Sequence, residues 1–219
     1  MTEQTALLLG RGIYDLNELA RLTGRSPDEV SGWALPATAG RHQREALLLP
    51  AEGRLFSFLD LVTAIVCAEL RGRGVPLGKV RDAREHLADR LHVDRPFAHK
   101  EGLRRLATVG RDVYFYEDSD WVDAGKGGQA AFKIVVAPLI RRLKFGADGM
   151  AAAWRPVDGI LLDPLVQAGA PCLEGTRVST QFVLSLVEAG EAPEDIADDY
   201  ELPLKTIKKA LDFEYTLAA

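Results

Sequence analysis

Two consecutive helix-start signals near the N-terminus constrain the fold of this chain more than any other feature of its sequence. Asp15 is followed at the third position by Glu18, and the run Ser26-Pro27-Asp28-Glu29 repeats that spacing with a proline at the second position. Asp and Ser side chains cap helix N-termini, and proline suits the first helical position. Because Thr23-Gly24-Arg25 separates the two signals, the sequence predicts two short helices joined by a tight turn, a helix-turn-helix.

The residues that follow predict a wing and two supporting helices. Prolines and glycines surround the apolar run of residues 46–49, which suits a strand pair within residues 37–53. Apolar positions at helical spacing then predict a long helix that begins at residues 57–60 and ends at Gly72. A second amphipathic helix follows Val75-Pro76. Together these elements predict a winged helix-turn-helix over residues 1–95.

The middle segment, residues 96–156, predicts a small α+β connector. Residues 112–117 are rich in aromatic and β-branched side chains, which favours a strand. Residues 118–128 predict a polar loop, residues 131–145 a helix containing Pro138, and residues 149–157 a strand that pairs with the first one.

The last segment, residues 157–219, predicts a compact unit of three helices. The first covers residues 180–189, the second begins at Pro193 after the weak N-cap Ala192, and the third follows Pro203. The predicted fold class is therefore mainly α (α+β): an N-terminal winged helix-turn-helix, a small α+β connector and a C-terminal three-helix domain.

Charge is distributed unevenly along the 219 residues. The net charge of -5 divides into 0 for residues 1–95, +3 for residues 96–156 and -8 for residues 157–219. The overall acidity argues against coating of nucleic acid, but it belongs to the last third of the chain. The asymmetry predicts two surfaces with different partners.

Several patterns predict a cytoplasmic protein that does not enter a membrane. Cys67 and Cys172 are far apart, so they form neither a disulfide framework nor a CxxC metal site. The N-terminus lacks the basic start and the long apolar core of a signal peptide. Charged and polar residues interrupt the apolar stretch of residues 59–70, which is too short for a bilayer.

The N-terminal pattern resembles the winged-helix head of MerR-type regulators over residues 13–92. The resemblance is carried by residues 14–30, Trp33, Arg54-Leu-Phe-Ser-Phe and Leu70-Arg-Gly-Arg-Gly-Val-Pro-Leu. It implies that two helices and a wing grip DNA. The second helix offers Asp28 and Glu29 where that family presents arginines, and the long coiled coil and sensor cysteines are missing, so effector-gated activation is not implied.

The C-terminal pattern resembles the small helical domain of VapB-type antitoxins over residues 163–215. The resemblance is carried by Gly169-Ala-Pro-Cys-Leu-Glu-Gly-Thr-Arg-Val-Ser-Thr, Glu188-Ala-Gly-Glu-Ala-Pro-Glu-Asp-Ile and Asp199-Tyr. Its hallmark is a Gly-Thr-Arg turn ahead of three helices. Here the structural turn is formed by Gly175, Thr176 and Arg177. The resemblance implies an antitoxin that neutralises a PIN-like ribonuclease toxin and binds operator DNA.

The candidate DNA-binding residues lie in the predicted helix-turn-helix and wing. Guanidinium groups can pair with phosphates or guanine, and the candidates are Arg21, Arg25, Ser31, Arg41, His42, Arg44 and Arg54. The alternative is that these arginines form a solvated face, balanced by as many acidic residues in the same segment. The third C-terminal helix carries Lys205, Lys208 and Lys209, but its acidic surroundings favour partner binding or dimerisation over DNA contact.

No motif in the sequence predicts a catalytic residue, a metal or a cofactor. His86, His92 and His99 are spaced by six and seven residues, which does not bring two of them to one helical face as metal ligands. The acidic residues at 118, 120 and 123 lack the register of a calcium loop. Residues 125–128 lack the spacing of a phosphate-binding loop, and no catalytic triad stands out.

The sequence thus predicts a non-enzymatic antitoxin and autorepressor whose partners are operator DNA and a cognate ribonuclease toxin. A homodimer is expected because two-fold proteins bind palindromic operators. Two alternatives stay open: a stand-alone MerR-like transcription regulator, and an interaction adaptor that does not bind DNA.

Overall fold

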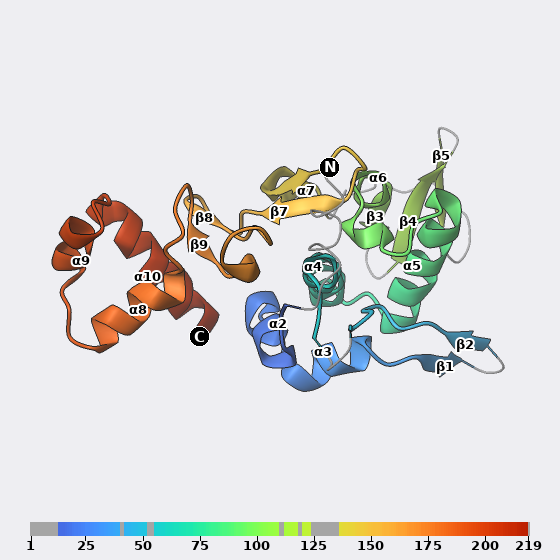
Figure 1. The fold of residues 1–219 in the computed structure, drawn as a ribbon. Coiled ribbons are helices and arrows are strands. Elements are labelled where there is room, and N and C mark those ends of the chain that lie inside the picture. The colour runs from blue at the N-terminus through green and yellow to red at the C-terminus, as the bar shows by residue number, and fades with distance from the viewer. Residues whose placement is uncertain are drawn as a thin grey trace. The chain divides into compact units, whose positions relative to one another are not determined.

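The chain folds into two compact units, Met1–Ala151 and Ala152–Ala219 (Figure 1). This computed structural model describes residues 13–39, 42–51, 55–109, 112–117, 120–123 and 136–218. Helices dominate both units and small antiparallel sheets complete them, so the predicted mainly helical α+β fold class is confirmed. The finer division into residues 1–95, 96–156 and 157–219 stays a prediction.

The two capped helices at the N-terminus are present as predicted. They are α2 (Leu16–Thr23) and α3 (Pro27–Trp33). The side chains of Asp15 and Ser26 accept hydrogen bonds from the backbone N–H groups three residues on, at 2.8 and 3.2 Å. Gly24 ends α2 with φ at 62°, a left-handed conformation that glycine adopts without steric cost.

The predicted strand pair lies at the start of residues 37–53. Strand β1 (Ala37–Ala39) pairs antiparallel with β2 (His42–Arg44). The apolar run of residues 46–49 is not a strand, which corrects the prediction. The N–H groups of Leu47 and Leu48 instead donate to the carbonyl of Trp33 at 2.8 and 3.2 Å, and both leucine side chains are buried. The run is therefore apolar because it covers the end of α3.

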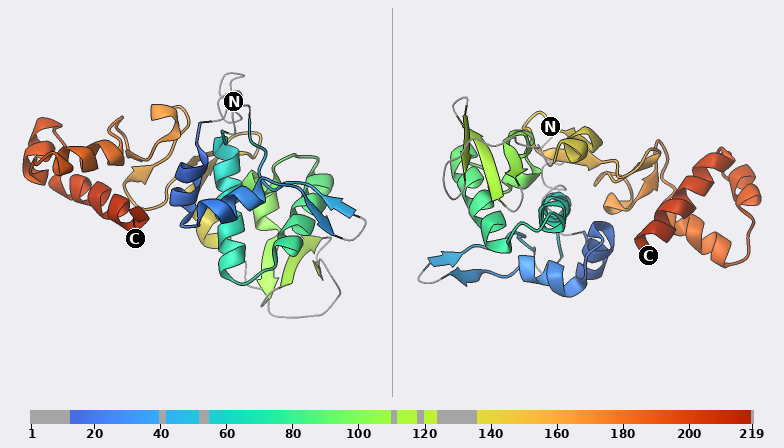
Figure 2. Two further views of the ribbon diagram at one scale, coloured as in Figure 1. Left: turned by 90° about the horizontal axis from the view of Figure 1, so that it is seen from below. Right: turned by 180° about the vertical axis from the view of Figure 1, so that it is seen from behind.

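Helix α4 (Phe58–Gly72) forms the core of the first unit. Residues on almost every face of α4 are buried, and both α2 and α5 (Leu77–Leu91) contact it (Figure 2). Ser57 and Asp60 begin α4 with a reciprocal capping box, in which each side chain accepts from the backbone N–H of the other. Both predicted supporting helices are confirmed.

The middle segment contains more strands than the sequence predicted. Its first elements are η2 (Pro96–Ala98), α6 (Lys100–Arg104), β3 (Leu106–Val109), β4 (Asp112–Glu117) and β5 (Asp120–Asp123). The three strands form one antiparallel sheet with β4 in the centre. The prediction of a strand at residues 112–117 is confirmed, whereas the predicted loop is wrong at β5. An edge strand is stabilised by backbone pairing with its neighbour, which a polar composition does not reveal.

Two further predictions for this segment are partly wrong. Within residues 131–145, of which 131–135 lie outside the described residues, the helix is only α7 (Ala137–Arg142), and β6 (Leu143–Phe145) follows it. Pro138 lies in the first turn of α7, where the missing N–H costs no hydrogen bond. Strand β7 (Ala151–Trp154) is present, but β6 is its sheet neighbour, while β4 pairs with β3 and β5.

The second unit contains the three predicted helices. They are α8 (Thr180–Glu188), α9 (Pro193–Asp199) and α10 (Leu204–Ala218), and they follow β8 (Ile160–Leu161), the short helix η3 (Gln167–Gly169) and β9 (Cys172–Leu173). Val183, Ile196 and Ile207 are fully buried between the helices. Ala192 caps α9 without a side-chain hydrogen bond, as the sequence predicted. Among the described helices, none has both the length and the apolar character needed to cross a bilayer.

Candidate functional site

Two of the predicted DNA-binding arginines brace the first unit internally. Arg25 donates to the carbonyl of Ala68 in α4 at 2.6 Å and lies 4.0 Å from the carboxylate of Glu29. Arg44, at the end of β2, pairs with Asp82 of α5 at 2.8 Å. The side chains of Arg25 and Arg44 are still 27% and 28% exposed. Each therefore supports the fold and leaves part of its guanidinium accessible.

The other described candidates for DNA binding lie in the helix pair α2–α3 and in the β1–β2 hairpin. Arg21 lies in the last turn of α2, where its charge offsets part of the rise that burial causes in the pKa of Glu18. Ser31 is half-buried in α3 and His42 belongs to β2. Arg41 and Arg54 lie outside the described residues. The described part of the candidate set thus comes from α2, α3, their turn and the β1–β2 hairpin.

One acidic residue of α3, Glu29, lies close to two neighbouring arginines. Glu29 lies within 4.0 Å of Arg25 and within 3.9 Å of Arg71, which projects from α4. The pairing holds the start of α3 against the core helix. This explains why α3 carries an acidic residue in its first turn, and it leaves less of that turn available for phosphate contact.

Three arginines that the sequence analysis did not single out hold the hairpin and the chain after it. Arg81 of α5 is 2% exposed and donates to the carbonyls of Gly32, Leu35 and Glu45. Burial lowers the pKa of Arg81 from its usual value. Arg84 pairs with the carboxylate of Glu45 and donates to the carbonyl of Asp94 at 2.9 Å. The positions of β1 and β2 are therefore set from α5.

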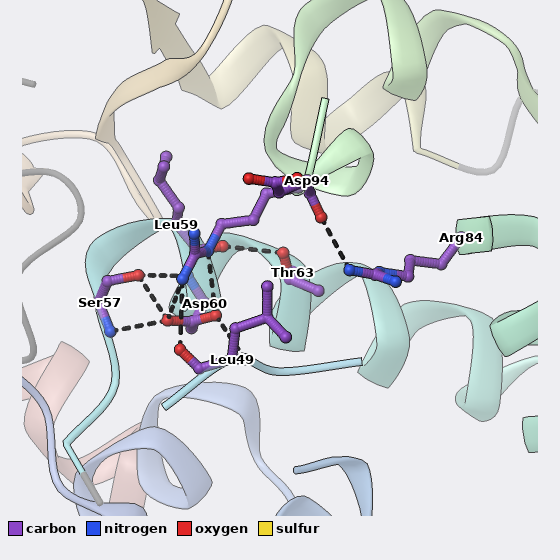
Figure 3. Close-up of polar contacts among 8 residues, drawn as sticks. Leu49, Ser57, Leu59, Asp60, Thr63, Arg84 and Asp94 are labelled. Carbon is purple, nitrogen blue, oxygen red and sulfur yellow. Dashed lines mark hydrogen bonds and ion pairs between the residues drawn. The ribbon is translucent and has the colours of Figure 1, made fainter. Parts of the chain in front are cut away.

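The third arginine belongs to a buried carboxylate cluster at the start of α4 (Figure 3). Asp60 is 1% exposed and accepts hydrogen bonds from the N–H groups of Leu49 and Ser57, both at 3.0 Å. The guanidinium of Arg95 lies 3.3 Å from the same carboxylate and also donates to the carbonyl of Leu49 at 3.2 Å. This cluster ties the apolar run after the hairpin to α4, so its role is structural.

The Gly-Thr-Arg turn of the second unit lies between β9 and α8. Gly175 adopts a φ of 85°, and the Thr176 hydroxyl donates to the carbonyl of Leu173 at 2.9 Å while it accepts from the N–H of Val178 at 3.0 Å. The carbonyl of Arg177 accepts from the side-chain amide of Gln167 at 2.9 Å. These bonds fix the backbone on both sides of Arg177, whose side chain is exposed.

A groove of about 430 Å³ opens beside this turn. Its walls come from η3, the turn itself and helices α8 and α9, and they contain Gln167, Ala170, Arg177, Val178, Ser179, Phe182 and Tyr200. The rings of Phe182 and Tyr200 meet edge to face, 5.7 Å apart, and each residue is 40% exposed. The groove combines one guanidinium, one side-chain amide, the hydroxyls of Ser179 and Tyr200, and two accessible aromatic rings. The sequence predicted Phe182 only as part of the helix over residues 180–189.

The lysines of α10 behave as surface groups. Lys208 lies 3.6 Å from Glu194 of α9, with both side chains more than half exposed, and Lys205 is exposed as well. Lys209 packs near Gly159. An exposed pair of this kind contributes little to stability. The lysines are thus available on the surface of an otherwise acidic unit.

The three histidines that the sequence does not predict to be metal ligands lie within helices or at helix ends. His86 belongs to α5, His92 ends α5 with a φ of 52°, and His99 caps α6 by accepting from the N–H of Glu101 at 3.3 Å. Among the described residues, no group of three His, Cys, Asp or Glu side chains could hold a metal ion.

Comparison with known proteins links the second unit to a protein family. A family model described as "Protein of unknown function (DUF433)" matches residues 160–213. The match begins at β8, includes the Gly-Thr-Arg turn and ends within α10.

Two proteins of Mycobacterium tuberculosis (strain ATCC 25618 / H37Rv) are similar to most of this chain. "Uncharacterized protein Rv2308" is 27% identical, with 96% of this chain and 94% of that protein aligned. "Putative antitoxin VapB45" is 29% identical, with 82% of this chain and 75% of that protein aligned. The crystal structure of Rv2018 from the same species shares the fold, with a TM-score of 0.67 at 21% identity over 93% of this chain and 99% of that one.

Proposed function

We propose that this chain is a non-enzymatic antitoxin that binds and neutralises a PIN-like ribonuclease toxin and represses its own operon by binding operator DNA. One observation carries the proposal: a relative 29% identical over 82% of this chain bears the name "Putative antitoxin VapB45". The Gly-Thr-Arg turn and the three helices of the second unit support it, because they form the part of the chain that resembles VapB-type antitoxins.

The proposal assigns different partners to the two units. The second unit has five basic and twelve acidic residues, so it repels the phosphates of DNA and attracts a basic protein. The first unit contains the helix pair α2–α3 and the β1–β2 hairpin, with partly exposed guanidinium groups at Arg25 and Arg44. We assign toxin binding to the second unit and operator binding to the first, as a homodimer on a palindromic site.

Toxin binding is tested with the product of the adjacent reading frame. Co-expression should yield a complex that co-purifies in a pull-down, and it should relieve the growth arrest that the neighbouring product causes alone. If no complex forms and the arrest persists, the antitoxin function fails. A stand-alone MerR-like regulator would then be the remaining DNA-binding alternative.

Operator binding is tested by titration against the chain's own promoter at several salt concentrations. Arg41→Ala combined with Arg44→Ala should weaken binding. It should also lower the slope of log affinity against log salt concentration by the amount expected for the loss of about one to two phosphate contacts. A double variant of equal charge, Arg73→Ala with Lys205→Ala, should bind as the wild type does. Circular dichroism checks the fold, since Arg44 also pairs with Asp82.

One observation favours the alternative of an interaction adaptor that does not bind DNA. The guanidinium groups of Arg25 and Arg44 already make internal bonds to Ala68 and Asp82. An adaptor would bind the promoter weakly, without sequence preference, and equally well after the arginine substitutions. That result would remove operator binding and leave the toxin interaction to be judged by its own experiment.

A further inference from the structure

We propose that the groove beside the Gly-Thr-Arg turn binds a segment of the partner protein that carries a carboxylate next to an apolar or aromatic side chain. The inference rests on the proposed function, because the partner is the proposed toxin. It goes further by naming the site on the second unit and the chemistry of the segment that this site recognises.

The guanidinium of Arg177 is the anion-binding group of the groove. Its side chain is exposed and, within the part of the chain that the structure describes, it makes no hydrogen bond or ion pair. This contrasts with Arg155 of the same unit, which pairs with Glu174. A guanidinium at the wall of a groove offers paired N–H donors that match a carboxylate.

The two aromatic rings are the apolar part of the same groove. Phe182 comes from α8 and Tyr200 from the end of α9, and their edge-to-face contact at 5.7 Å gives each ring a defined position. Exposed aromatic side chains beside an arginine have the composition of binding hot spots, since all three residue types bury large areas at interfaces. An apolar side chain seated against these rings places an adjacent carboxylate within reach of Arg177.

The short helix η3, which bonds to the backbone of Arg177, contains two residues in an uncommon conformation. Gln167 and Ala168 have φ values of 47° and 51°, in the left-handed region that side chains other than glycine rarely adopt. The amide of Gln167 nevertheless binds the carbonyl of Arg177 at 2.9 Å. Strained backbone of this kind persists where the surroundings hold it, and it is concentrated at binding sites.

Charge identifies the occupant as a protein segment of the proposed toxin. The unit has twelve acidic and five basic residues, so nucleic acid would be repelled along its length. A second copy of the unit would bring the same excess of acidic charge and would also be repelled. A ribonuclease needs a basic surface to bind RNA, and a carboxylate within that surface matches the exposed guanidinium of Arg177 within this acidic one.

The test uses the full chain and the purified product of the adjacent reading frame. Arg177→Ala, Phe182→Ala and Tyr200→Ala should each weaken the complex by about tenfold or more in isothermal titration calorimetry, as truncation of a hot-spot residue does. Two matched controls lie in the same unit and outside the groove: Lys205→Ala removes an equal charge, and Tyr215→Ala removes an aromatic ring that is 55% exposed. Both controls should bind within about twofold of the wild type.

A second measurement needs no substitution. In amide NMR spectra of the wild type, addition of the neighbouring product should shift the signals of Gln167, Arg177, Phe182 and Tyr200 more than those of the exposed lysines of α10. If the wild type binds, the groove variants bind equally well and these signals do not shift, the proposed role of the groove is overturned while the antitoxin function stands. If the wild type does not bind, the proposed function itself fails and the inference fails with it. Dimerisation lost in the groove variants would assign the groove to a second copy and overturn the proposal.

Discussion

At the scale of single residues, buried charges in the first unit serve to position backbone. Asp60 and Arg81 are 1% and 2% exposed, and each bonds to backbone groups of segments that have no regular structure of their own. A buried charge is costly unless it is paired and hydrogen-bonded. Asp60 meets both conditions through Arg95 and two backbone N–H groups. Arg81 is held by hydrogen bonds to three carbonyls, and its buried Nε has no partner among the described residues. The sequence predicted Asp60 only at the start of a helix and Arg81 only as one charge among many, because nothing local distinguishes a buried charge from a solvated one.

We predict that Asp60→Asn lowers the free energy of unfolding by about 3 kcal/mol, the cost of breaking a buried, hydrogen-bonded ion pair. The amide would present a donor to the N–H groups of Leu49 and Ser57 and would leave Arg95 without its partner charge. Urea denaturation measures the loss. Glu69→Gln is the control, because Glu69 pairs with Arg73 on the surface, and it should cost less than about 1 kcal/mol. Equal effects of the two variants would contradict a structural role for the cluster.

A second prediction concerns the Cys67 thiol. Burial raises its pKa well above the usual value, and the nearby charge of Arg81 offsets part of that rise. The pKa of a thiol in an unfolded chain is about 8.5. The stability that the neutral buried thiol contributes is therefore intact below that pH and is lost as the pH rises above it. The stability difference between the wild type and Cys67→Ala should therefore shrink by about 1 kcal/mol between pH 7.5 and 9.5 in urea titrations. A difference that stays constant would show that Cys67 ionises as readily in the folded protein.

At the scale of elements, helix starts were predicted better than strand pairing, because helix signals are local and strand pairing depends on long-range packing. Caps at Asp15, Ser26 and Ser57 mark helices that begin where the sequence predicted. Strand partners were less predictable: β5 was expected to be a loop, and β7 was expected to pair with β4. A helix satisfies its backbone within its own segment, whereas a strand needs a partner that residues far along the chain provide.

Two helical glycines give a prediction at this scale, because the space around them differs. A Cβ on Gly102 of α6 would lie 2.0 Å from the carbonyl oxygen of Pro96, so Gly102→Ala should displace η2 and destabilise the first unit. A Cβ on Gly32 of α3 would meet nothing within 4 Å. Gly32→Ala should therefore raise stability by about 0.5–1 kcal/mol, the helix propensity difference. Thermal unfolding followed by circular dichroism should show shifts of opposite sign, and shifts of the same sign would contradict the packing of α6 against η2.

At the scale of the whole molecule, the chain combines a unit of nearly balanced charge with a strongly acidic one. Seven of the twelve acidic residues of the second unit are exposed and lie between Glu188 and Glu201, at the end of α8, in α9 and in the adjoining turns. A charge excess of this size acts beyond contact distance and is screened by salt. If the first unit binds operator DNA as proposed, we expect the acidic second unit to limit non-specific binding to DNA.

This distribution predicts the behaviour of a triple variant. Glu188→Gln, Glu191→Gln and Asp198→Asn remove three exposed carboxylates outside the groove. The variant should bind random-sequence duplex DNA more tightly than the wild type at low salt, because repulsion of phosphates is reduced, and the two should converge as salt screens the charges. Fluorescence anisotropy measures the affinity of the wild type and of the variant for the duplex at each salt concentration. Unchanged affinity at low salt would show that the acidic unit does not influence encounters with DNA.

The sequence by itself determined the capped helices of the N-terminal segment, the three C-terminal helices, the turn at Gly175 and the mainly helical fold class, because caps, glycine conformation and helical periodicity act within a few residues. The candidate residues for DNA contact are likewise a prediction from the sequence, and titration against promoter DNA tests them. Only the tertiary structure decided the partners of the strands, the burial of Asp60 and Arg81, and the meeting of Arg177 with Phe182 and Tyr200 in one groove. Those features depend on contacts between segments far apart in the chain, and such contacts exist only once the core has formed.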